Sequence, residues 1–187
     1  MRRPAAIACL ASLLLATAFA TGAEVPPLRK PAPYPPHALE RAISFEGFGA
    51  ARFGDGEEAL RKAWGEPLED AGDPLEDCRY LVPEAPHADM GVAFMVEGGR
   101  FVRIDITDPR IRAKGGGHIG MDKAALLALY PGAIVSGHHY DDDGAYVEVP
   151  GPQGSEAAII FETDGRGVVT VWRVGVHPQV GYVEGCA

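Results

Sequence analysis

Apolar and polar residues alternate with a period of two along several short stretches of this chain, which is the pattern of half-buried β-strands. Two apolar runs flank the pair Gly98-Gly99, and two more flank Asp164-Gly165; both pairs favour the tight turn of a β-hairpin. The pattern as a whole predicts strands at residues 44–50, 78–82, 91–97, 100–107, 133–135, 145–149, 157–163 and 167–176.

Two other stretches have the spacing of amphipathic helices. In residues 56–64, Leu60 and Trp64 lie four positions apart and therefore share one face. In residues 121–130, the leucines at positions 126, 127 and 129 are apolar, and Pro131 with the glycine after it ends the pattern. We expect both helices to pack against the predicted sheet.

The helix and the hairpin that follows it occur twice at a nearly constant spacing. Leu60 has its counterpart in Leu126, an offset of 66 residues, and Phe94 has its counterpart in Phe161, an offset of 67. A constant offset over a helix and a later strand pair indicates two copies of one unit. The predicted fold class is α+β, with two tandem helix-plus-antiparallel-meander repeats that form one domain with a largely antiparallel sheet.

The N-terminal residues predict export. Arg2 and Arg3 precede an apolar run at 5–20 and small residues up to Ala23, which is the pattern of a cleaved signal peptide. An uncleaved anchor is less favoured, because a membrane span needs about 20 strongly apolar residues. Six prolines between residues 26 and 36 then predict a stiff spacer. The predicted parts are a signal peptide (1–23), a Pro-rich spacer (24–42) and a single α+β domain (43–187), whose repeats occupy about 44–110 and 111–177 and whose C-terminal tail is 178–187.

The charge of the chain limits its partners. The formal net charge is −9 at pH 7, and loss of the two arginines of the signal peptide makes it −11. An acidic protein of this kind is a poor ligand for nucleic acid or anionic lipid. We therefore expect another protein as the partner, with no nucleic acid, no membrane span and no cofactor. The alanine-rich signal is typical of bacteria, so the expected location is the periplasm.

The cysteines predict one disulfide. Cys9 lies in the predicted signal peptide, so Cys78 and Cys186 remain as an even pair in an oxidising compartment. The alternative is a two-thiol redox or metal site, for which the sequence has no Cys-x-x-Cys motif. A disulfide between these two cysteines would tie the C-terminal tail to the first repeat.

The outward-facing side of the predicted sheet is the expected binding surface. In the strand at 100–107, the polar side chains of Arg103 and Asp105 alternate with apolar ones and should face away from the core. The repeat alignment places Trp172 on that same side, and Tyr80 and Tyr146, which correspond at an offset of 66, could join it. Aromatic residues and arginine are favoured in protein interfaces. The alternative is that Trp172 lies beneath the C-terminal tail or the Pro-rich segment.

The order of elements resembles known exported proteins. A small helix followed by a meander, twice in tandem, resembles the β-lactamase-inhibitor-protein architecture and is similar to the small outer-membrane assembly lipoproteins of the SmpA/OmlA type. Gly-x-x-x-Gly-Met-Asp-Lys at residues 116–123 is similar to the helix start of those lipoproteins, and Tyr-Val-Glu-Gly-Cys at 182–186 resembles an uncharacterised family of proteobacterial exported proteins. The resemblance covers about residues 44–176 and implies a binding module, without assigning any functional residue. The chain lacks a lipobox, and it has one cysteine pair where the inhibitor would have one per repeat.

The segment 138–143 carries the most reactive-looking side chains. His138, His139 and Asp141 are candidate metal ligands, because imidazoles with carboxylates bind Zn²⁺ and acidic runs bind Ca²⁺. Adjacent histidines point to opposite sides of an extended strand, however, and three consecutive aspartates lack the alternation of a calcium loop. A solvated loop is therefore favoured over a metal site. No nucleophile stands in a recognisable catalytic motif, so we expect no enzyme.

Three functions are left open, in order of preference. The first is an exported, non-catalytic protein-binding module, inhibitor- or immunity-like, that binds through the solvent face of its sheet. The second, which the resemblance implies, is a factor for cell-envelope or outer-membrane assembly or maintenance. The third is a metal-dependent hydrolase that uses the segment 138–143.

Overall fold

The computed structural model describes residues 35–71, 77–85 and 87–186, so the predicted signal peptide and the spacer up to residue 34 lie outside the described residues. The helices are α1 (Pro36–Ala42), α2 (Glu57–Trp64) and α3 (Lys123–Leu129), with a 3-10 turn η1 (Gln179–Gly181). The strands are β1 (Ile43–Ser44), β2 (Gly47–Phe48), β3 (Ala51–Arg52), β4 (Leu68–Asp70), β5 (Cys78–Pro83), β6 (Val92–Glu97), β7 (Arg100–Ile106), β8 (Ile134–Gly137), β9 (Ala145–Pro150), β10 (Ala157–Thr163) and β11 (Val169–Val176).

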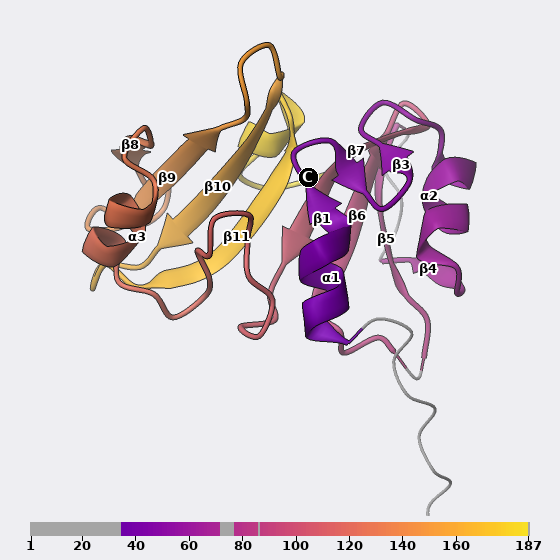
Figure 1. The fold of residues 1–187 in the computed structure, drawn as a ribbon, viewed down its shortest axis with the longest axis horizontal. Coiled ribbons are helices and arrows are strands. Elements are labelled where there is room, and N and C mark those ends of the chain that lie inside the picture. The colour runs from indigo at the N-terminus through magenta and orange to yellow at the C-terminus, as the bar shows by residue number, and fades with distance from the viewer. Residues whose placement is uncertain (1–34, 72–76, 86, 187) are drawn as a thin grey trace, which may run out of the picture.

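The fold is of the α+β class, with a largely antiparallel sheet. Eight strands are arranged in the order β4-β5-β6-β7-β11-β10-β9-β8, and every neighbouring pair is antiparallel. This order is symmetric about the central pair β7–β11, because α2 precedes one four-stranded meander and α3 precedes the other. In Figure 1, α2 and α3 accordingly lie at opposite ends of the sheet, with α1 between them. A separate three-stranded sheet has the order β1-β2-β3.

The first half has an aromatic core. Helix α2 ends at Gly65, whose φ of +80° is the left-handed conformation that favours glycine at a helix terminus. Its residue Trp64 is buried, with its ring centroid 5.6 Å from that of Phe48 and 5.5 Å from that of Phe94. Aromatic rings in this tilted or edge-on geometry pack favourably and fix the helix on the sheet.

The second half packs around Tyr130, at the end of α3. The Tyr130 hydroxyl donates a hydrogen bond to the Lys114 carbonyl at 2.7 Å and accepts one from the Gly117 amide at 2.9 Å. A Cβ atom on Gly117 would come within 2.5 Å of the Phe161 ring, so only glycine fits there. The run of three glycines after Lys114 therefore packs closely around a buried tyrosine.

Three local expectations need correction. Helix α1 lies inside the predicted spacer, because Pro36 stands at the first helical position, where proline's missing N–H costs nothing, and Leu39 is buried. Strand β4 lies between the predicted helix at 56–64 and the predicted strand at 78–82, where no strand was expected; Leu68 is buried there and pairs opposite Pro83. The single strand expected at 44–50 is replaced by the three short strands β1 to β3. Within the described residues, no helix has the length and apolarity needed to cross a membrane.

Candidate functional site

The sheet has two different faces, and a bulge decides which one Trp172 joins. Thr163 pairs with Val169 but Glu162 pairs with Val171, so strand β11 holds one extra residue at this point. An extra residue reverses the alternation of side chains beyond it. Trp172 consequently lies in the core with 0% exposure, and its indole N–H donates a hydrogen bond to the Ile111 carbonyl at 3.3 Å. The prediction that Trp172 faces outward is therefore wrong.

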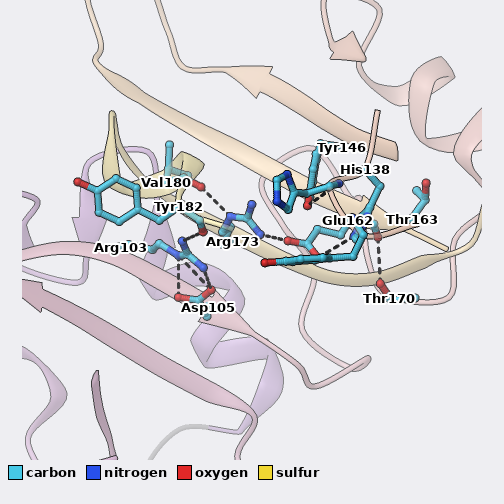
Figure 2. A network of polar contacts seen from close by, with 12 residues as sticks. Arg103, Asp105, His138, Tyr146, Glu162, Thr163, Thr170, Arg173, Val180 and Tyr182 are labelled. Carbon is cyan, nitrogen blue, oxygen red and sulfur yellow. Dashed lines mark hydrogen bonds and ion pairs between the residues drawn. The ribbon is translucent and has the colours of Figure 1, made fainter. Parts of the chain in front are cut away.

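Arg173 takes the outward position instead and lies beside Arg103. We call the side of the sheet that carries these arginines the outer face; the helices pack on the other. Arg173 pairs opposite Asp105 in the ladder between β11 and β7. Both guanidinium groups are almost fully covered, since each arginine is 3% exposed. Each has a carboxylate partner, Asp105 for Arg103 and Glu162 for Arg173 (Figure 2).

The C-terminal tail, residues 178–186, covers these arginines. The Arg103 guanidinium donates hydrogen bonds to the carbonyl oxygens of Gln179 at 3.0 Å and Tyr182 at 2.6 Å. Arg173 Nε donates to the Val180 carbonyl at 2.6 Å (Figure 2). Val180 is fully buried over strand β10, where it packs with Ile160. The centre of the outer face is therefore occupied by the protein's own chain.

A disulfide fixes the end of the tail. Cys78 and Cys186 are bonded, as predicted from the cysteine count. The turn before Cys186 lies on Tyr80, because a Cβ atom on Gly185 would come within 2.8 Å of the Tyr80 hydroxyl oxygen. Burial, helped by the nearby Asp105 carboxylate, raises the pKa of Tyr80 above its ordinary range. Tyr80, Arg103 and Asp105 were expected to form a free binding surface, and the tail removes most of that surface from solvent.

Removal of this disulfide should destabilise the fold. The two cysteines are 108 residues apart in the sequence, and closing a loop of that length restricts the unfolded chain strongly. We expect the double substitution Cys78→Ala, Cys186→Ala to lower the free energy of unfolding by about 2–4 kcal/mol. Urea denaturation of the two proteins measures the difference, and reductant should lower the wild-type midpoint in the same way. Equal midpoints for wild type and variant would contradict this expectation.

The loop 138–144 is organised by His138. Its Nδ1 accepts hydrogen bonds from the backbone amides of Tyr140 and Asp141, each at 3.1 Å. An Nδ1 that accepts cannot carry the proton, so in this arrangement Nε2 carries it and faces Glu162 Oε2 at 3.5 Å. The ring also stacks on Tyr146, with centroids 4.7 Å apart (Figure 2). Both nitrogens of His138 thus have protein partners.

The other candidate ligands do not join His138. The His139 side chain lies edge-on against the ring of Tyr140, with centroids 4.6 Å apart. The Asp141 carboxylate accepts a hydrogen bond from the Asp143 amide at 3.1 Å, which is local turn geometry. Over the described ranges of the chain, no group of three or more His, Cys, Asp or Glu side chains could hold a metal ion.

A groove of about 460 Å³ lies between this loop and the C-terminal tail. It is lined by Cys78, Glu97, His139, Tyr140, Tyr182, Val183, Glu184, Gly185 and Cys186. Its most exposed apolar side chains are Tyr140 at 62% and Val183 at 36%. The Tyr140 hydroxyl donates a hydrogen bond to the Glu184 carboxylate, and this bond raises the tyrosine's pKa. Glu97 and Glu184 make the groove acidic.

Sequence reasoning missed the residues of this groove, apart from His139 and the two cysteines. Tyr140 and Val183 belong to segments without a periodic pattern, and nothing local places them together. The predicted disulfide was the available signal, because it brings residues 182–186 to the start of β5. Of the predicted binding residues, Tyr146 is half-buried beside His138, and the guanidinium of Arg173 lies 5.7 Å from its ring centroid.

Known proteins offer little for comparison. No protein-family model matches this sequence, and no curated protein matches it. Among solved structures, the fold is similar to that of an extracellular protein containing a SCP domain from Bacillus anthracis str. Ames, with 15% sequence identity and a TM-score of 0.46 over 67% of this chain. This chain spans 44% of the length of that protein. It is also similar to the uncharacterized protein yfeY from Escherichia coli, with 18% identity and a TM-score of 0.47 over 72% of this chain and 99% of the other.

Proposed function

We propose that this chain is an exported, non-catalytic protein-binding module, inhibitor- or immunity-like, whose partner binds in the groove on the outer face. Export to the periplasm is supported by the N-terminal pattern of residues 1–23 and by the disulfide, since such bonds persist in oxidising compartments. The observation that carries the proposal is the groove itself, with an exposed tyrosine and valine held between two fixed segments.

The composition of the groove suits a protein ligand. Tyr140 offers a large amphipathic surface with few rotatable bonds, which is why tyrosine is frequent among residues that dominate binding energy. The tail side of the groove is fixed by the disulfide and by the carbonyl bonds to Arg103. Rigid walls reduce the entropy lost when a partner binds.

The charge of the groove suits a basic anchor. The carboxylates of Glu97 and Glu184 line it, and no Lys or Arg is among its lining residues. A lysine or arginine of the partner would meet opposite charge there, with Tyr140 as an aromatic neighbour. Charge complementarity of this kind also speeds the encounter with a basic protein.

A photocrosslinking experiment tests the proposal. Tyr140 is replaced by p-benzoylphenylalanine in the full chain, which is then irradiated in cells, and adducts are identified by mass spectrometry. We expect one predominant protein adduct, and a second substitution, Val183→Lys, should lower its yield about tenfold or more, because it removes an apolar contact and places positive charge opposite the basic anchor.

The matched control is the same photoreactive residue at Arg166. That side chain is also exposed, at 83%, but lies in the turn between β10 and β11 and does not line the groove. The same adduct in equal yield from both positions would contradict the proposal, as would a yield that Val183→Lys leaves unchanged.

A further inference from the structure

The two edges of the eight-stranded sheet differ in how they are protected. Strand β4 carries the charged residues Glu69 and Asp70; Asp70 forms an ion pair with Arg79 at 3.2 Å, and Arg61 donates a hydrogen bond to the Leu68 carbonyl at 2.7 Å. Charged residues and occupied backbone groups discourage an edge from pairing with another strand. At the opposite edge, all four residues of β8 are exposed and none is charged.

Strand β8 lies in an unusual stretch of sequence. Residues 124–140 contain no Asp, Glu, Lys or Arg, although the chain as a whole is acidic. Of the five large apolar side chains exposed in the described part of the chain, four lie in this stretch: Leu129, Ile134, Val135 and Tyr140. Exposed apolar side chains on a free strand edge are typical of an interaction site.

The backbone of β8 has groups directed away from the sheet. The His138 amide donates a hydrogen bond to the Gly144 carbonyl at 3.2 Å. Every second residue pair along the ladder between β8 and β9 is therefore hydrogen-bonded, namely Ile134 with Glu148 and Ser136 with Tyr146. In an antiparallel ladder such pairs alternate with non-bonded ones. The N–H and C=O groups of the residues between them, Val135 and Gly137, therefore point outward, and no other described strand pairs with them.

We propose that β8 pairs with β8 of a second copy of this chain, antiparallel and centred on Val135. In this register Val135 lies opposite Val135 of the second copy, and Ile134 opposite Ser136. In this register, odd-numbered residues lie opposite odd-numbered residues, so the outward-pointing N–H and C=O groups of the two strands can bond to one another. Side chains that face the core in one copy lie opposite core-facing side chains of the other copy. The pairing is thus self-complementary, as a two-fold interface requires.

Charge favours a second copy as the occupant of this edge. Each chain carries a net charge of −9, so two copies repel wherever their acidic residues approach. The stretch 124–140 lets them meet without opposing like charges. The resulting dimer is one continuous sheet, with both grooves on the same side of it.

Sedimentation velocity of the mature, disulfide-bonded protein over a wide concentration range tests the proposal. We expect a species of twice the chain mass to grow with concentration, and Val135→Lys to weaken association at least about tenfold, because it places like charges directly opposite each other. Hydrogen exchange at the amides of Val135 and Gly137 should slow with increasing concentration. Glu69→Lys at the β4 edge is the matched control and should leave association unchanged.

Each of three results would overturn the proposal. The first is a chain that stays monomeric throughout. The second is a dimer that Val135→Lys leaves intact while Val135 and Gly137 exchange rapidly. The third is a monomer in which these two amides are protected at every concentration, since another occupant would then hold the edge. The unfolding midpoint of Val135→Lys at low concentration verifies that the variant is folded.

Discussion

Replacing Arg103 with methionine is expected to lower the free energy of unfolding by about 3–5 kcal/mol. Methionine fills much of the same volume but donates no hydrogen bond. The Asp105 carboxylate, with a side chain only 17% exposed, then loses its bonded cation, and two tail carbonyls lose their donor. An unpaired charge left in a covered site is costly because it has lost most of its contact with water. Urea denaturation, with the midpoint and slope measured separately, reports the loss.

Two further variants sharpen this test. Arg166→Met removes an arginine whose side chain is 83% exposed and which pairs with Asp164, and it should cost less than about 1 kcal/mol. The double variant Arg103→Met, Asp105→Leu should be more stable than Arg103→Met alone, because it leaves no carboxylate without a partner. A loss for Arg103→Met no greater than that for Arg166→Met would show that the covered network contributes little.

Trp172→Ala should destabilise the protein by about 3–5 kcal/mol, which is the cost of removing a large aromatic side chain from a packed core. The Trp172 ring is fully enclosed, with its centroid 6.2 Å from that of Phe161, and its loss also leaves the Ile111 carbonyl without its donor. Thermal and urea unfolding measure the effect. A tryptophan on an exposed binding face would instead have left stability nearly unchanged when replaced.

Leu129→Ala is the matched control for this variant. Leu129 is also a large apolar residue, but it is 45% exposed, so its truncation should change stability by about 0.5 kcal/mol or less. Trp172→Phe should lose less than Trp172→Ala, since an aromatic ring keeps most of the packing. Similar midpoints for Trp172→Ala and Leu129→Ala would contradict the core position of Trp172.

Much of the sheet could be predicted because its signals are local. The turns at Gly98-Gly99 and Asp164-Gly165 join strands whose period of two is evident in the sequence, and β10 has the predicted bounds. Helices α2 and α3 also lie within their predicted ranges, because Leu60 and Trp64 share one face of α2 and Pro131 ends the apolar pattern of α3.

What could not be predicted depends mainly on the exact register of paired strands. The extra residue in β11 is defined by its register with β10, and no local sequence pattern indicates it. Because of this one residue, Trp172 faces the core. Strand β4 is three residues long and has two charged members, which resembles a loop until its pairing with β5 is known. The six prolines at residues 26–36 predict a stiff spacer, whereas Pro36 occupies the first helical position of α1, where a helix accepts proline.

The candidate site, too, could be predicted only in part. The cysteine count was enough to predict that residue 186 lies beside residue 78, since two cysteines in an exported chain allow only one intramolecular disulfide. The position of the tail over the arginines was not predictable, because backbone carbonyls accept its hydrogen bonds and every residue type has such a carbonyl. Tyr140 lies within the segment 138–143, where the sequence indicated only candidate metal ligands, and its contact with Glu184 joins two irregular segments.

The position of the covering segment has a consequence for biosynthesis. Residues 178–186 are synthesised after every strand that they contact, so Arg103 and Arg173 lack these carbonyl acceptors in any chain that ends earlier. A translation product interrupted before residue 178 would therefore contain all the strands of the sheet and yet lack the segment that covers its two central arginines.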